Sequence, residues 1–299
     1  MTQFAISLPQ AEFDPGAFRA FVTRAEELGF DSAWTQEQVL GSAPRLGPVE
    51  VMTYAAACTT TLRLGCAVFV STLHSPLHLA KSISTLDHLS GGRVEVGIGA
   101  GGPSRALSAF GVSRDGLVTR FTEGLALMKA AWTEPEITFQ GRFWQVEGLR
   151  MEPKPVQKPH PRVWIGGGHP NAVKRAAHLA DGFFGAGSST TEAFAEQVRI
   201  LREALGGREF PIAKRVYIRV DDDTDRARRH ISDDLDKLYG FFGMKGKLAP
   251  VAVAGTPEDC IRGLREVEAA GAELIQLNPM SDDAAQLERL AAEVIPAFA

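Results

Sequence analysis

The chain has 299 residues, a formal net charge of −4, 44% hydrophobic and 23% charged residues. This composition is typical of a globular enzyme and gives no reason to expect nucleic acid or a membrane surface as a partner. No apolar run approaches the roughly 20 residues that a membrane helix needs, and residues 1–4 lead directly into a strand pattern rather than a secretion signal. Cys58, Cys66 and Cys260 form no close pair, so we expect a cytoplasmic protein without disulfides or a thiolate zinc site.

The first part of the chain alternates between strand and helix patterns. The continuous apolar run 62–70 is typical of a strand buried on both faces. Gly29 and Gly91 follow helical patterns at the position of a left-handed cap, and Pro76 occupies a first helical position. We predict strands over 4–8, 32–36, 62–70 and 94–99, and helices over 15–28, 49–60, 76–89 and 115–132.

The segment 135–161 interrupts this alternation because it is rich in proline and aromatic residues. It predicts a short hairpin with strands over 137–139 and 143–146. After it the alternation resumes, and Thr256 with Asp259 predicts a capping box that opens a helix. We predict strands over 162–165, 182–186, 215–220 and 273–277, helices over 170–180, 191–205, 224–239 and 282–297, and a loop over 245–253.

Eight strands, each followed by a helix, favour an α/β fold of the (β/α)8 TIM-barrel type, formed by residues 1–299 as a single domain. Long connections predict insertions after strands 4 and 7. An open doubly wound sheet is the alternative, but it calls for a glycine-rich turn after the first strand, where this chain has Pro9-Gln10. In a barrel, the loops that follow the strands build the functional face.

Two glycine clusters follow predicted strands. Gly97, Gly99 and Gly101 are spaced by two, which favours a planar ring packed on bare backbone; a tight turn without a ligand is the alternative. Residues 166–168 are all glycine and precede a helix, where exposed N–H groups and the helix dipole favour a phosphate. His169 either adds a donor to that phosphate or caps the helix.

Polar residues after the second and third strands are the other candidates. Glu37 is a proton donor, a hydrogen-bond partner for a ring, or a solvated loop acid. His74 and His78 are spaced like metal ligands, but Pro76 places the helix start between them and no third ligand is evident, so we expect no metal site.

Aromatic and basic residues allow two interpretations. Phe143 and Trp144 lie in the irregular segment and are candidates for a pocket wall, whereas Trp164, Phe183 and Phe184 lie in strands and are expected in the core. The basic run 226–229 is expected to be a solvated helix face; a patch that attracts an acidic ligand is the alternative.

Taken in order, these segments resemble the bacterial luciferase-like family of flavin- and deazaflavin-dependent oxidoreductases. No single segment is decisive, but their order and spacing are specific. The matching segments are 25–34, 62–65, 75–81, 85–93, 97–101, 120–123, 153–157 and 180–183.

This resemblance implies a (β/α)8 barrel that forms a homodimer and binds a small-molecule substrate. It implies a cofactor ring at the carboxyl ends of the strands, and a non-prolyl cis peptide at Ala67–Val68 that forms a bulge beneath the ring. It also implies that the cofactor phosphate binds the glycine turn. The cofactor-binding residues expected on this basis are Ala67, Val68, Gly99, Ala100, Gly101, Gly166, Gly167, Gly168 and His169.

The first three helices, which carry Phe18, Phe21, Met52 and Tyr54, are expected to form the dimer interface.

The branch that uses coenzyme F420 is the most similar, through residues 34–38 and the segment that starts at Ser71. The chain departs from it at Gln38, where a histidine is common. It also departs at Gly102 and at 187–190, where the sugar-phosphate branch has an acid and a lysine. A sugar phosphate is therefore not expected as substrate, and Glu37 and Gln38 are the expected catalytic residues.

We therefore expect an oxidoreductase that transfers a hydride between F420 and a small organic substrate. The alternatives are an FMN-dependent monooxygenase and a non-enzymatic flavin-binding protein. F420 carries a long acidic tail, for which the open stretch 187–191 leaves an exit, and Lys174 or Arg105 is a candidate to meet its charge.

Overall fold

Parallel strands alternate with helices throughout the computed structural model, which describes residues 2–9, 13–41, 44–101, 105–240, 243 and 245–298. The strands are β1 Gln3–Ser7, β2 Ser32–Thr35, β3 Arg63–Val70, β4 Val94–Gly99, β5 Ile137–Gln140, β6 Gln145–Leu149, β7 Arg162–Ile165, β8 Gly182–Gly185, β9 Ile212–Val220, β10 Val253–Gly255 and β11 Leu274–Asn278. The helices are α1 Pro15–Glu27, α2 Pro48–Cys58, α3 Pro76–Ser90, α4 Leu117–Thr133, α5 Pro170–Leu179, α6 Thr191–Leu205, α7 Thr224–Tyr239, α8 Pro257–Ala269 and α9 Asp283–Arg289.

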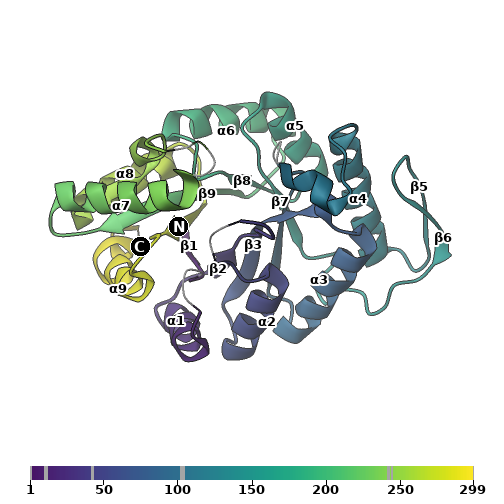
Figure 1. The fold of residues 1–299 in the computed structure, drawn as a ribbon, viewed down its shortest axis with the longest axis horizontal. Coiled ribbons are helices and arrows are strands. Elements are labelled where there is room, and N and C mark those ends of the chain that lie inside the picture. Colours follow the sequence, from purple (N-terminus) through teal and green to yellow (C-terminus); the bar gives the residue numbers. More distant parts are fainter. Residues whose placement is uncertain are drawn as a thin grey trace. The chain divides into compact units, whose positions relative to one another are not determined.

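The fold is a (β/α)8 barrel, as predicted (Figure 1). The main sheet has the order β10-β9-β11-β1-β2-β3-β4-β7-β8, and β8 also pairs with β9. By its contacts the chain divides into a first unit, Met1–Trp34 with Trp164–Ala299, and a second unit, Thr35–Val163. The single domain over 1–299 stays a prediction.

Aromatic rings fill the core of the first unit. The ring of Trp34 lies 4.8 Å from that of Phe184 and 6.0 Å from that of Trp164, both edge to face. Phe183 is fully buried, so the prediction that the strand aromatics belong to the core is confirmed.

Two segments of the second unit that carry the family resemblance, 85–93 and 153–157, form buried hydrogen bonds. The guanidinium of Arg93 donates to the carbonyls of Ala56, Thr59 and Leu62, and so satisfies backbone groups at and beyond the end of α2. Asp87, which is fully buried, accepts hydrogen bonds from both the backbone and the side-chain amide of Gln157. These hydrogen bonds therefore connect segment 85–93 to the end of α2 and to segment 153–157.

Most helix ends and strands lie where the sequence predicts them. Gly91 ends α3 in the left-handed region at φ 67°, and Thr256 with Asp259 forms the predicted capping box. Strand β9 begins at Ile212 instead of Arg215, and β10 overlaps the end of the predicted 245–253 loop, pairing with β9 at Val253.

The C-terminal helix also differs from the prediction. Helix α9 ends at Arg289 and continues as a π-helix, Leu290–Val294, and a 3-10 helix, Ile295–Phe298. Pro296 has no backbone N–H to donate to an α-helical ladder, which accounts for the change.

The interface residues expected for a dimer are largely core residues. Phe18, Phe21 and Met52 are each at most 5% exposed within the single chain, so their packing serves their own unit. These three residues are therefore not surplus to the core, whereas Tyr54 is partly exposed. A dimer interface on the first three helices stays a prediction.

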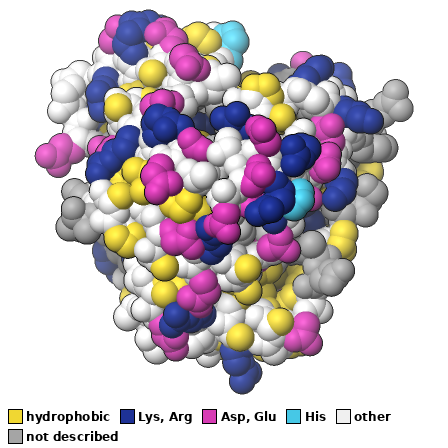
Figure 2. Space-filling view, turned by 90° about the vertical axis from the view of Figure 1, so that its left-hand side faces the viewer, with side chains coloured by type: hydrophobic (Ala, Val, Ile, Leu, Met, Phe, Trp, Pro, Cys, Tyr) yellow, Lys and Arg dark blue, Asp and Glu magenta, His cyan; other side chains and the backbone are white. Residues whose placement is uncertain are grey.

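The face that carries α7, α8 and α9 mixes basic and acidic side chains (Figure 2). Arg226 pairs with Asp221 and thereby lowers the pKa of that carboxyl well below its ordinary value, while Arg228 and Arg229 are exposed. This agrees with the expected solvated helix face. Among the described helices, none is long and apolar enough to cross a membrane.

Candidate functional site

Strand β3 of the second unit contains the predicted bulge. The Ala67–Val68 peptide is cis, and the register with β4 shifts between Cys66 and Phe69. Cys66 and Phe69 are fully buried, whereas Ala67 and Val68 are partly exposed. The bulge thus turns two small side chains and their backbone toward accessible space.

The glycine row of β4 fits against this bulge. A Cβ at Gly97 would collide with the Cys66 carbonyl oxygen, a Cβ at Gly99 would lie 2.9 Å from Val68, and one at Gly101 would lie 2.8 Å from Val70. Gly101 also adopts a φ of +76°. The spacing by two therefore follows from the close approach of β3, and contact of this row with a ring stays a prediction.

Glu37, in the segment that follows β2, forms two hydrogen bonds with β3 at the bulge. Its backbone N–H donates to the Val68 carbonyl at 3.4 Å, and its Oε2 accepts a hydrogen bond from the Val70 N–H at 2.6 Å. The side chain is 4% exposed. The alternative of a solvated loop acid is therefore wrong.

His74 is the residue that the sequence reasoning undervalued. Its Nε2 lies 2.8 Å from the second carboxylate oxygen of Glu37, and its side chain is 31% exposed. The preceding 3-10 turn, Ser71–Leu73, is held by a 2.9 Å hydrogen bond from Thr72 Oγ1 to the Ala100 carbonyl. A histidine directly after a strand, near a candidate acid after the neighbouring strand, is the signal that identifies it.

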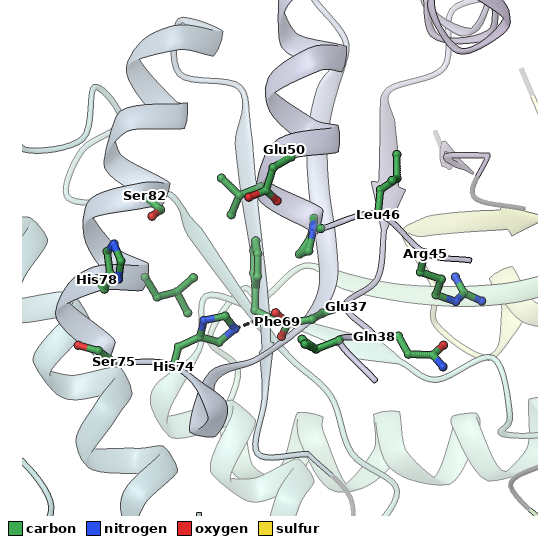
Figure 3. Close-up of a pocket in the computed structure, with 15 residues that line it drawn as sticks. Glu37, Gln38, Arg45, Leu46, Glu50, Phe69, His74, Ser75, His78 and Ser82 are labelled. Atoms are coloured by element: carbon green, nitrogen blue, oxygen red, sulfur yellow. Dashed lines mark hydrogen bonds and ion pairs between the residues drawn. The ribbon is translucent and has the colours of Figure 1, made fainter. Parts of the chain in front are cut away.

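The Glu37–His74 pair lies at a pocket of ≈ 430 Å³ in the second unit, where Figure 3 shows the two side chains pointing at each other. Gln38 contributes to the same wall. The lining residues are Glu37, Gln38, Val39, Arg45, Leu46, Gly47, Pro48, Val49, Glu50, Phe69, His74, Ser75, His78, Leu79 and Ser82. The lining therefore mixes ionisable side chains with apolar ones.

Phe143 and Trp144 do not line this pocket. They pack against Arg120 of α4, whose guanidinium carbon lies 5.8 Å and 4.6 Å from the two rings. Glu123 accepts a 2.8 Å hydrogen bond from the Phe143 N–H. These contacts attach the β5–β6 hairpin to α4, and they give the two aromatic residues a structural role.

The glycine turn lies in the first unit, between β7 and α5. A Cβ at Gly166 would collide with the Phe184 carbonyl oxygen, and one at Gly167 would lie 2.6 Å from Ala172 Cβ. At Gly168 a Cβ would come no closer than 3.9 Å to Gln197 Nε2, so space remains there. His169 is the N-cap of α5, and its Nδ1 accepts from the Asn171 N–H at 3.2 Å. The remaining ring nitrogen, Nε2, therefore carries the proton of the neutral ring.

A buried lysine holds the loop next to this turn. Lys214 is 3% exposed and donates to the carbonyls of Ala186 and Ser189, the latter at 3.0 Å. Ser189 Oγ accepts from Gln197 at 3.4 Å. Burial, with the charge of Arg215 as a smaller cause, lowers the pKa of Lys214 from 10.5 to about 7.

The remaining positions that the sequence singled out for the cofactor tail or the substrate show no contact among the described residues that defines a site. Lys174 is exposed on α5, and Ser188 and Thr190 are exposed in the loop before α6. Gly102 and the side chain of Arg105 lie outside the described part of the structure.

A family profile described as luciferase-like monooxygenase matches residues 1–274. The chain is 30% identical over 233 residues to the F420-dependent glucose-6-phosphate dehydrogenase of Kineococcus radiotolerans, covering 73% of this chain and 67% of that one. It is 28% identical over 247 residues to the FMNH(2)-dependent dimethylsulfone monooxygenase of Pseudomonas putida, covering 78% and 66%. The match thus spans about two thirds of each relative's length.

A solved structure has the same fold. Monooxygenase RslO1 from Streptomyces bottropensis superimposes with a TM-score of 0.87 at 23% identity, covering 99% of this chain and 100% of that chain.

Proposed function

Because the chain belongs to the luciferase-like monooxygenase family, we propose that it is an oxidoreductase that transfers a hydride between coenzyme F420 and a small organic substrate. The observation that carries this proposal is the braced bulge of β3, where Ala67 and Val68 are partly exposed although the residues beside them are buried. Such a ledge of small side chains suits a flat ring, and we assign the ring contacts to Ala67, Val68, Gly99, Ala100 and Gly101.

In the first unit we assign the cofactor phosphate to Gly166, Gly167, Gly168 and His169. The space at Gly168 and the amino end of α5 favour an anion there, and the protonated Nε2 of His169 is a further donor. Ser188 and Thr190 are exposed, and we assign the acidic tail of the cofactor to this loop.

In the second unit we assign Glu37 and Gln38 to the reaction centre. Both oxygens of Glu37 are engaged, one by a backbone N–H and one by His74. Its role is therefore that of a fixed acceptor, while Gln38 lines the same pocket. When bound, the deazaflavin supplies or accepts a hydride at a ring carbon.

An FMN-dependent monooxygenase is the second candidate. A relative named for FMNH(2) matches over 78% of this chain, and FMN has the same ring shape and a phosphate. We favour F420 because a relative named for F420 is 30% identical over 73% of this chain, and because the exposed Ser188 and Thr190 are candidates to lie beside a long tail, which FMN lacks.

The deciding experiment is a fluorescence titration of the apoprotein with F420 and with FMN in parallel. The proposal expects micromolar or tighter binding of F420 and at least tenfold weaker binding of FMN, a difference of about 1.4 kcal/mol. Tight binding of FMN without binding of F420 would establish the monooxygenase candidate instead. Binding without turnover of any carbonyl or alcohol substrate would point to a flavin-binding protein.

We also propose a homodimer. With Phe18, Phe21 and Met52 buried in their own units, this proposal rests on the family resemblance and not on surplus hydrophobic residues.

A further inference from the structure

The side-chain amide of Gln197 is a buried polar group that no part of the proposed function uses. Gln197 lies on α6 of the first unit and is 6% exposed. Among the described residues, its amide has a single hydrogen-bond partner, Ser189 Oγ, at the long distance of 3.4 Å. Because buried amides are normally well hydrogen bonded, the second N–H of this side chain requires a further acceptor.

This amide faces the glycine turn that precedes α5. Helices α5 and α6 pack side by side (Figure 1). Gln197 Nε2 is the nearest atom, at 3.9 Å, to a Cβ built on Gly168. The amide therefore lies across open space from the backbone of the turn.

The turn itself presents donors rather than acceptors. Within the described part of the chain, no group accepts a hydrogen bond from the backbone N–H of Gly167, Gly168 or His169. These N–H groups and the Gln197 amide gather at the amino end of α5, where the helix dipole is positive. A cluster of donors in this position is the chemistry of an anion site.

The loop after β8 fixes the amide from the other side. The Ser189 N–H donates to the Ala186 carbonyl at 3.1 Å, and Lys214 donates to the carbonyls of both residues. The buried lysine thus holds both ends of this short turn, and the turn holds Ser189 Oγ beside the amide of Gln197. A donor held in this way is pre-organised, because it loses little rotamer freedom when a ligand binds.

We propose that Gln197 is a phosphate-binding residue, whose Nε2 donates a hydrogen bond to an oxygen of the phosphate ester at the Gly166–Gly168 turn. Ser189 and Lys214 are its positioning residues. This inference rests on the proposed function for the identity of the ligand, and the same contact serves the phosphate of F420 or that of FMN.

The first test compares ligands with and without a phosphate. Fluorescence titration gives the Kd values of FMN and riboflavin, which differ only in the phosphate, and of F420 and its chromophore without phosphate and tail. For the pair that the wild type binds, the Kd of the phosphate-free ligand is divided by that of the phosphate-bearing ligand. This Kd ratio measures the phosphate contacts.

Gln197→Met keeps the length of the side chain but removes the amide. It should lower the Kd ratio about tenfold or more and leave the Kd of the phosphate-free ligand within about threefold. Gln197→Glu keeps the shape but replaces the donor with a negative charge, so it should lower the ratio further. Ser189→Ala should lower it by a smaller factor, because the amide remains but is less firmly held.

Gln145→Met is the matched control, since Gln145 is exposed on β6 in the other unit and should leave the Kd ratio unchanged. An unchanged ratio in folded Gln197→Met and Gln197→Glu would overturn the proposal. An equal loss of affinity for both ligands would overturn it as well, because that is the result of a purely structural role for Gln197.

The second test needs no cofactor and uses inorganic phosphate as the probe of the apoprotein. Phosphate stabilises folded proteins in general because it is excluded from their surface, so the difference between variants is the quantity of interest. Relative to chloride at equal ionic strength, phosphate should raise the Tm of the wild type and of Gln145→Met by more than that of Gln197→Met. Equal Tm shifts in all three proteins would overturn the assignment of Gln197.

The two proposals fail separately. If the wild-type protein binds neither F420 nor FMN, the proposed function falls, while the Tm shifts in inorganic phosphate still decide whether Gln197 belongs to an anion site. If a cofactor binds but Gln197→Met matches the wild type in both tests, only the present inference falls.

Discussion

The carboxylate of Glu37 accepts a hydrogen bond from the backbone N–H of Val70 at 2.6 Å. This contact joins the segment after β2 to the end of β3, directly beyond the bulge. Because the same carboxylate also faces His74, one buried side chain sets both the backbone of the proposed ring ledge and the orientation of the imidazole. Changes at Glu37 should therefore affect stability and catalysis by different amounts, depending on what replaces it.

Glu37→Gln should lower turnover far more than cofactor affinity, since the amide still fills the space but offers one acceptor oxygen in place of the two that face Val70 and His74. Glu37→Ala should in addition destabilise the fold by about 1–3 kcal/mol, because it leaves the partly buried Val70 N–H without its acceptor. Steady-state kinetics, fluorescence titration and urea unfolding measure the three quantities. Equal activity of Glu37→Gln and the wild type at every pH would remove Glu37 from the mechanism.

Gly167→Val should weaken cofactor binding at least tenfold, about 1.4 kcal/mol, because its side chain would crowd Ala172 and displace the turn that we assign to phosphate. Gly240→Ala is the control outside the proposed phosphate site, since Gly240 has a helical φ of −58° and its new Cβ would come no closer than 3.9 Å to Lys245. We expect unchanged cofactor affinity for the control. Unchanged affinity in a folded Gly167→Val variant would contradict the phosphate assignment.

Lys214 should make stability depend on pH above neutrality. Its pKa is about 7 in the folded protein and 10.5 for an ordinary lysine, so between these values the unfolded chain binds the extra proton. Stability therefore rises with pH across this window, and the cost of burying the charge is complete below pH 7. The Tm of the wild type should thus rise relative to that of Lys214→Met between pH 6.5 and 9.5.

The exposed Lys237, changed to Met, serves as the control for Lys214 and should show no such difference. A Tm difference between the wild type and Lys214→Met that stays constant with pH would mean that Lys214 titrates normally.

Asp283 should act in the acidic range. Burial, with the neighbouring charge of Asp282 as a smaller cause, raises its pKa from 3.8 to about 6, so the folded protein holds the extra proton between these values. Stability linked to this group is present below pH 3.8 and is lost as the pH rises through 6. Asp283→Asn should therefore stabilise the protein at pH 7.5 by up to about 3 kcal/mol, less any effect of partial exposure, and little at pH 4. Thermal unfolding at both pH values measures this, and equal Tm shifts would refute it.

The homodimer should show a mass of twice the 32.2 kDa chain in light scattering at micromolar concentration. A monomeric mass at the same concentration would refute the proposed assembly without affecting the assignment of the site.

The sequence alone determined the features that depend on near neighbours. The left-handed cap at Gly91, the capping box of Thr256 with Asp259 and strand Val94–Gly99 all lie where the pattern predicts, because each depends on residues a few positions apart. The alternation of such elements was sufficient for the barrel class.

The tertiary structure decided what depends on distant residues. Strand β10 is short and forms through its pairing with β9, so its own residues give no strand pattern. Glu37 and His74 are 37 positions apart. From the sequence, Glu37 was an expected catalytic residue without a known partner, and His74 was weighed only as a metal ligand. Only the fold makes the acid buried and the histidine oriented, since burial and hydrogen-bond partners are properties of packing and not of local sequence.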